Sequence, residues 1–178
     1  LLYGDEQAVA VYGCIGYITS ILYLLLQGVG DGSQPLISQY YGKGDHRCVR
    51  ATRKLAYLTA IVVTAICMAG VYLARAKVGT LFGASQEANA GVIQYLPLFL
   101  ATLLCLAFVR ITTSYFYATE KNKLSYLLVY AEPVCTLLML LILPPVLKLT
   151  GVWLAVPIAQ VLTFVIAWVA KGRVDAKI

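Results

Sequence analysis

Charged side chains are scarce in this 178-residue sequence, in which Asp, Glu, Lys and Arg together make up only 12% and histidine occurs once. A soluble globular domain carries about 25% charged residues. Hydrophobic residues make up 61% of the sequence, and the mean hydropathy is +0.81. Such values exclude a disordered chain, which requires low hydrophobicity, and they argue against a soluble enzyme. They indicate that lipid is the main solvent.

Catalytic and metal-binding motifs are also missing. The sequence contains no H-E-x-x-H and no Gly-x-Ser-x-Gly motif, and its cysteines have no C-x2-C spacing. We therefore expect no enzymatic activity, no cofactor and no metal site. The cysteines are interpreted as small hydrophobic residues of the interior. They are Cys14, Cys48, Cys67, Cys105 and Cys135.

The beginning of the sequence is atypical of a natural N-terminus. It starts at Leu1, and no charged segment precedes the first apolar run, as a signal peptide would require. We expect the chain to be a piece of a longer protein.

Long apolar runs predict an all-α fold, a polytopic membrane helix bundle. A transmembrane helix needs about 20 mainly apolar residues, and five stretches satisfy that requirement. The connections between them are too short for a soluble domain, so residues 1–178 are interpreted as a single partial transmembrane lobe. The expected spans are 8–41, 48–74, 92–117, 124–147 and 152–170.

Basic residues alternate between the two sides of these spans, ten on one side and three on the other. Because Lys and Arg concentrate in cytoplasmic loops, we expect a multi-pass protein of the plasma membrane with its N-terminal end outside and its C-terminus in the cytoplasm. An upstream helix would then bring the unit to six helices. The alternation explains the net charge of +6 without a nucleic acid partner. The ten are Lys43, Arg47, Arg50, Arg53, Lys54, Lys121, Lys123, Lys171, Arg173 and Lys177.

Four of these basic residues recur at helical spacing where the second span begins. Arg47, Arg50, Arg53 and Lys54 either extend into the headgroup layer, as long basic side chains do, or form a specific site for an anionic lipid.

The first expected span is interrupted by residues that weaken a helix. Its 34 residues would measure about 51 Å as a helix, whereas the hydrocarbon core is about 30 Å thick. Gly28, Gly30 and Gly32 lower helix stability, and Pro35 removes a backbone donor. Two interpretations remain open: close helix packing with a proline kink, or a discontinuous helix whose free backbone and Asp31 line a polar cavity.

Four polar residues are expected at one depth of the membrane. Asp31, Arg110, Glu132 and Gln160 each lie 9–12 residues from a basic residue of the expected cytoplasmic side, or roughly 13–18 Å along a helix. Ionisable groups at that depth usually face the interior of the bundle. Together with Gln34, these are the candidate cavity or coupling residues.

Arg110 and Glu132 lie almost opposite each other across the hairpin of the third and fourth spans. We expect an ion pair or a shared water. The pair either locks the hairpin or titrates during transport; alternatively, Arg110 extends to the cytoplasmic face.

Most of the thirteen tyrosines lie near the ends of the expected spans and are interpreted as an interfacial belt. Tyr17 and Tyr23 lie deeper and are candidates to face a cavity, where an aromatic ring would suit an organic cation.

Two stretches resemble a known family. The segment QGVGDGSQPLISQYYGKGDHRCVRATR, residues 27–53, is similar to the second helix and following loop in the C-terminal lobe of multidrug and toxic compound extrusion (MATE) transporters. The segment LTGVWLAVPIAQVL, residues 149–162, resembles the start of that lobe's last helix. The resemblance implies twelve helices in two lobes, of which this chain is the second lobe without its first helix.

The resemblance also implies a secondary-active antiporter that exports small organic cations in exchange for Na+ or H+. The implied partners are membrane lipid, the missing N-terminal lobe, the missing first helix and the substrate. The family's ion-binding carboxylates in this lobe are often on its first and fourth helices, but the corresponding third span here offers Arg110 instead. A lipid-linked oligosaccharide flippase of the same superfamily and a non-transporting membrane scaffold subunit are the alternatives.

Overall fold

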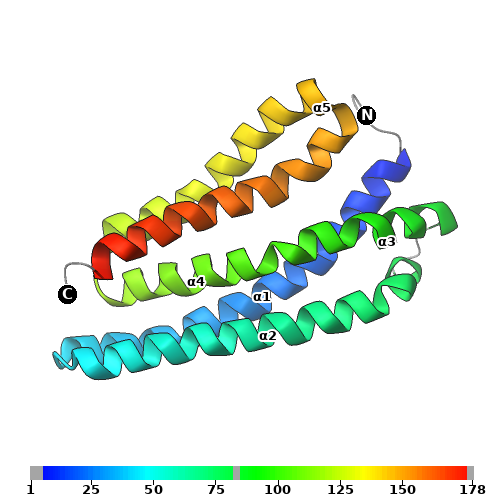
Figure 1. Cartoon of the computed structure of the whole chain (residues 1–178). Helices are drawn as coiled ribbons and strands as arrows, with labels where there is room; N and C mark the ends of the chain where they lie inside the picture. Colours follow the sequence, from blue (N-terminus) through cyan, green and yellow to red (C-terminus); the bar gives the residue numbers. More distant parts are fainter. Residues whose placement is uncertain (1–5, 82–84, 176–178) are drawn as a thin grey trace.

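The computed structural model describes residues 6–81 and 85–175, and within those ranges every element of secondary structure is an α-helix (Figure 1). The all-α prediction is confirmed for this part of the chain. The helices are α1 (Glu6–Gly42), α2 (His46–Leu81), α3 (Gln86–Ala101), α4 (Leu103–Ala118) and α5 (Asn122–Asp175).

Among the described residues, four helical stretches are long and apolar enough to cross a membrane: Glu6–Gly42, His46–Lys77, Gln86–Ala118 and Asn122–Asp175. The third stretch combines α3 and α4, which are separated only by Thr102. The fourth contains both of the last two expected spans. The prediction of five separate spans is therefore not confirmed in that form.

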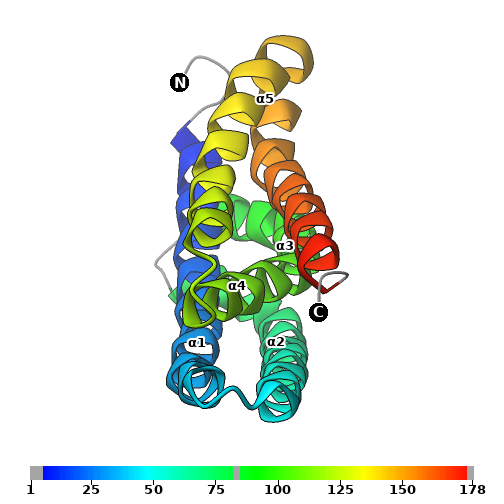
Figure 2. The same ribbon diagram turned by 90° about the vertical axis from the view of Figure 1, so that its left-hand side faces the viewer.

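α5 nevertheless consists of two arms. Lys148 has non-helical backbone angles (φ 53°, ψ −132°), and the chain reverses at this residue, so that residues 122–147 and 149–175 run back alongside each other (Figures 1 and 2). Pro144 and Pro145 precede the reversal and cannot donate to the carbonyls one turn earlier. Gly151 is buried in the reversal, where a Cβ atom would overlap the backbone carbonyl of Leu143.

The predicted helix break at Gly28, Gly30, Gly32 and Pro35 is wrong, because α1 continues through all four residues. Packing outweighs the weak helix propensity: α1 buries one face along most of its length, from Val11 to Ile37. Of the two interpretations of this segment, close helix packing fits the structure. A Cβ at Gly30 would lie 2.7 Å from Ser114 Oγ of α4, whereas Gly28 and Gly32 face open space.

Two apolar clusters hold the helices together. One contains Ile15, Leu96 and Leu103, with Trp153 from the second arm of α5. The other lies toward the opposite ends of α1 and α4 and contains Ile37 and Phe116. Both bring α1, α2 and α4 together, so the polar residues between α1, α4 and α5 are positioned by a packed frame.

The α1–α2 turn, the α4–α5 turn and the end of α5 lie at the same end of the molecule (Figure 1). Nine of the ten basic residues expected on one side of the membrane are at this end; the tenth, Lys177, lies outside the described residues.

Candidate functional site

The predicted ion pair between α4 and the first arm of α5 is present in the structure. Arg110 Nη2 donates to Glu132 Oε2 across 2.8 Å, and 20% and 25% of the two side chains is exposed. The α4–α5 turn brings the helices together in an antiparallel hairpin, so residues equally distant from the turn meet. Glu132 holds the guanidinium at this depth, so the side chain of Arg110 does not extend to the cytoplasmic end of its helix.

Arg110 also contacts α1 through an aromatic ring. Its Cζ lies 4.2 Å from the centre of the Tyr23 ring, within the range of a cation–π interaction. Tyr23 was expected to face a cavity, and it does line one, beside a cation supplied by the protein itself. The Nε atom of Arg110 is buried and has no hydrogen-bond partner within the described ranges.

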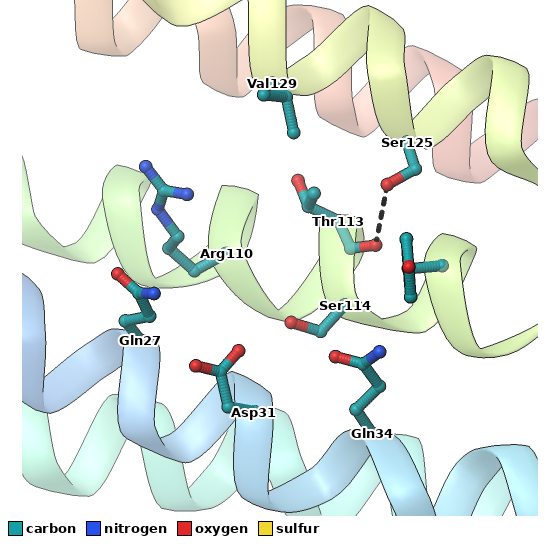
Figure 3. A pocket seen from close by; sticks show the side chains of 9 residues that line it. Gln27, Asp31, Gln34, Arg110, Thr113, Ser114, Ser125 and Val129 are labelled. Carbon is teal, nitrogen blue, oxygen red and sulfur yellow. Dashed lines mark hydrogen bonds between the residues drawn. The ribbon is translucent and has the colours of Figure 1, made fainter.

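A hollow of about 180 Å³ opens between α1, α4 and the first arm of α5; we call it the polar hollow (Figure 3). Asp31 and Gln34 of α1 line it, and Arg110 borders it from α4. The Asp31 carboxylate accepts no hydrogen bond and forms no ion pair with any residue that the structure describes. The other lining residues are Gln27, Thr113, Ser114, Tyr117, Ser125 and Val129.

A larger and more apolar hollow of about 610 Å³ adjoins it. Arg110 and Val129 line both hollows, so the two share a border. Glu132 lines the larger hollow, together with Tyr23 and Thr136. Asp31, Arg110 and Glu132 therefore line two adjoining open hollows between α1, α4 and the first arm of α5, with Asp31 itself exposed.

Gln160 does not join this group. It lines neither hollow, and its Oε1 accepts a hydrogen bond from Thr102 Oγ1. Thr102 is the residue that separates α3 from α4, and its hydroxyl also lies 2.9 Å from the carbonyl oxygen of Phe99. Thr102 lies eight residues before Arg110, roughly 12 Å along a helix, so Gln160 is not at the level of Arg110 as the spacing predicted.

The sequence analysis missed several residues of the polar hollow. Gln27 precedes Asp31 by four residues, and Gln34 follows by three, the spacing of one helix face. On α4, Thr113, Ser114 and Tyr117 lie three, four and seven residues after Arg110. Polar residues at helical spacing within an apolar span were the signal that could have identified them.

The polar hollow has the chemistry of a cation site. The unpaired Asp31 carboxylate shares the hollow with amide and hydroxyl groups from three helices, and Arg110, whose charge is paired with Glu132, borders it. Pro35 has no N–H and cannot donate to the carbonyl of Asp31, four residues earlier in α1. The main-chain carbonyl of Asp31 therefore lacks the donor that a helix normally supplies.

Comparison with known proteins identifies the family. The sequence profile of the family described as MatE matches residues 1–142. The chain belongs to the MatE family. The family consists of membrane transporters, so this chain is part of a multi-pass membrane protein.

Solved MATE structures share the fold. A structure described as the outward-facing conformation of a multidrug resistance MATE family transporter of the MOP superfamily superposes with a TM-score of 0.87 at 20% identity, covering 98% of this chain and 40% of that one. An inward-facing conformation gives 0.81 at 15% identity, with 90% and 37% covered. A MATE structure in a bent conformation gives 0.83 at 15% identity, with 92% and 37% covered.

The chain thus spans about 40% of the length of the solved transporters that it matches. No curated protein matches it.

Proposed function

We propose that this chain is part of a secondary-active antiporter that exports small organic cations in exchange for Na+ or H+ by alternating access. The observation that carries the proposal is the unpaired Asp31 carboxylate in a polar hollow between α1, α4 and α5. Ionisable groups within membrane spans are costly and usually serve transport. An uncompensated carboxylate there attracts either the coupling ion or a cationic substrate.

Arg110 and Glu132 have a different role in this proposal. Each neutralises the other at 2.8 Å, so neither offers a free charge to an ion. We propose that the pair holds α4 against α5 and leaves Asp31 as the exchangeable site of this chain.

The proposed topology has five crossings. α5 is 54 residues long and reverses at Lys148, and each arm is long enough to span about 30 Å of hydrocarbon. The α3–α4 stretch then crosses once, through the break at Thr102. With the basic end in the cytoplasm, residue 6 lies outside and residue 175 inside the plasma membrane.

Two alternatives make different demands on the same hollow. A flippase for lipid-linked oligosaccharides requires a cationic cavity for the pyrophosphate, but the only cation of the polar hollow in the described chain, Arg110, is paired with Glu132. A non-transporting scaffold subunit gains nothing from an unpaired intramembrane carboxylate, which only costs stability.

The test uses the full-length protein that contains this chain, reconstituted in liposomes with a fluorescent organic cation. We expect accumulation driven by an imposed Na+ or H+ gradient, and a loss of about ten-fold or more with Asp31→Asn, which keeps the shape but removes the charge. Glu120→Gln, an exposed acid in the α4–α5 turn, is the matched control. Unchanged gradient-driven transport by Asp31→Asn would contradict the proposal.

A further inference from the structure

Three basic side chains converge where the α1–α2 turn, the α4–α5 turn and the end of α5 meet. They are Arg53 of α2, Lys121 of the α4–α5 turn and Lys171 of α5, and we call them the basic cluster. It lies at the opposite end of the molecule from the Lys148 reversal (Figure 1), and no step of the proposed transport reaction uses it.

One carboxylate serves two of the three cations. Asp175 Oδ1 lies 2.7 Å from Arg53 Nη1, and Asp175 Oδ2 lies 3.2 Å from Lys171 Nζ. Both oxygens of Asp175 are therefore engaged. Arg53 is largely enclosed, with 14% of its side chain exposed.

Lys121 is left without a counter-ion, because no carboxylate of the described chain lies within ion-pair distance of it. Its Nζ lies 5.8 Å from the ring centres of both Tyr41 and Tyr115, and Arg53 stacks over the same Tyr115 ring at 4.6 Å. Burial, and then the positive charge of Arg53, lower the pKa of Lys121. The cluster therefore holds more positive charge than its own residues neutralise.

We propose that the basic cluster binds the phosphate group of an anionic phospholipid. Phosphate oxygens would accept hydrogen bonds from Lys121 and from donors that Asp175 leaves free, and would supply the missing negative charge. Basic pockets between membrane helices bind lipid headgroups in this manner. Around the cluster, the described part of this end carries nine Lys and Arg residues but only three acids, Asp45, Glu120 and Asp175.

Apolar side chains next to the cluster favour a lipid over free phosphate. Leu55 and Leu58 follow Arg53 on α2 and are 62% and 57% exposed, and Trp168 lies one turn before Lys171 and is 60% exposed. An acyl chain attached to the phosphate can lie along these residues. Inorganic phosphate gains nothing from them.

The experiment measures thermal stability of the full-length protein in a neutral detergent as lipid is titrated. The probes are dioleoyl phosphatidylglycerol, dioleoyl phosphatidylcholine and inorganic phosphate. We expect a saturable rise in melting temperature with phosphatidylglycerol only. Lys121→Gln should weaken the apparent affinity at least about five-fold, the effect of one basic residue near an anionic surface.

Matched variants keep the result interpretable. Lys123→Gln removes an exposed charge two residues away, outside the cluster, and should bind like the parent protein. Lys121→Arg should retain binding. Because Lys121 is repelled by Arg53, Lys121→Gln should melt no lower than the parent in phosphatidylcholine, which reports that it folds. If it unfolds instead, Lys171→Gln takes its place, with the same loss of affinity expected.

Three outcomes would overturn the proposal. An equal loss for Lys121→Gln and Lys123→Gln would show general surface charge instead of a built site. Equal stabilisation by phosphatidylcholine would show that headgroup charge is not recognised, and equal stabilisation by inorganic phosphate would show that no lipid is required. None of these outcomes depends on transport activity, so the failure of this inference is distinguishable from the failure of the proposed function.

Discussion

The guanidinium of Arg110 lies between two partners from different helices, with the Glu132 carboxylate of α5 at 2.8 Å and the Tyr23 ring of α1 at 4.2 Å. One side chain of α4 thus connects α1 and the first arm of α5 at the border of both hollows. Its charge is satisfied within the protein, whereas that of Asp31 is not.

The first prediction tests whether this pair is structural. Glu132→Gln should lower the free energy of unfolding by about 1–3 kcal/mol, because the partly buried guanidinium loses its counter-charge. Urea or thermal unfolding of the purified full-length protein measures the change. Combining it with Arg110→Gln should cost less than the sum of the single variants, as expected for groups in direct contact.

Gradient-driven transport by Glu132→Gln gives the complementary measurement. A variant that folds with parental stability but loses its dependence on Na+ or pH would show that the pair titrates during transport, contrary to the role proposed for it.

A second prediction concerns the reversal between the arms of α5. Gly151→Ala should destabilise the protein by about 1–3 kcal/mol, because the added methyl group overlaps the Leu143 backbone, which cannot rotate away. The matched control is Gly172→Ala, since Gly172 has open space and lies in the same helix. There, alanine should be neutral or stabilising by up to about 1 kcal/mol. Equal effects at the two sites would contradict the close approach.

The contact between α1 and α4 gives a third prediction. Gly30→Val should destabilise by about 1–3 kcal/mol, because its side chain meets Ser114. Gly28→Val, two residues earlier and facing open space, carries the same propensity cost without the clash. Adding Ser114→Gly to Gly30→Val should recover part of the loss. Without such recovery, Ser114 is not the contact that makes glycine necessary.

The fourth prediction links the start of α2 to pH. Asp45 Oδ1 accepts a hydrogen bond from the backbone N–H of Cys48 across 2.9 Å and thereby caps the helix. This bond favours the carboxylate and lowers the pKa of Asp45. Folding therefore gains stability from the ionised group above its ordinary pKa, and the gain is lost as the pH falls through the lowered value.

Asp45→Ala should accordingly lower the melting temperature at pH 7, and the difference from the parent should shrink as the medium is acidified below about pH 4. Asp45→Asn retains a capping oxygen and should melt closer to the parent at pH 7. A deficit of Asp45→Ala that persists unchanged in acid would argue against a charge-dependent cap.

The sequence by itself determined that lipid surrounds most of the chain and that the chain is helical. Scarce charge and long apolar runs permit few structures other than membrane helices, because lipid offers the backbone no hydrogen-bond partners. It also determined that Arg110 and Glu132 meet. A turn as short as residues 119–121 aligns the two helices, and the fixed rise per residue then sets which positions face each other.

Only the tertiary structure showed that α1 is continuous and which residues line the polar hollow. Gly30 and Pro35 weaken an isolated helix, but burial against α2, α3 and α4 stabilises it through both residues. Gln160 bonds to Thr102, eight residues before Arg110, and lines no hollow with Asp31, because the offset between two packed helices is not set by the spacing within either one. The rise of a helix fixes distance along its axis, whereas the direction in which a residue faces is set by side-chain packing between helices, which the spacing of residues in one chain does not specify.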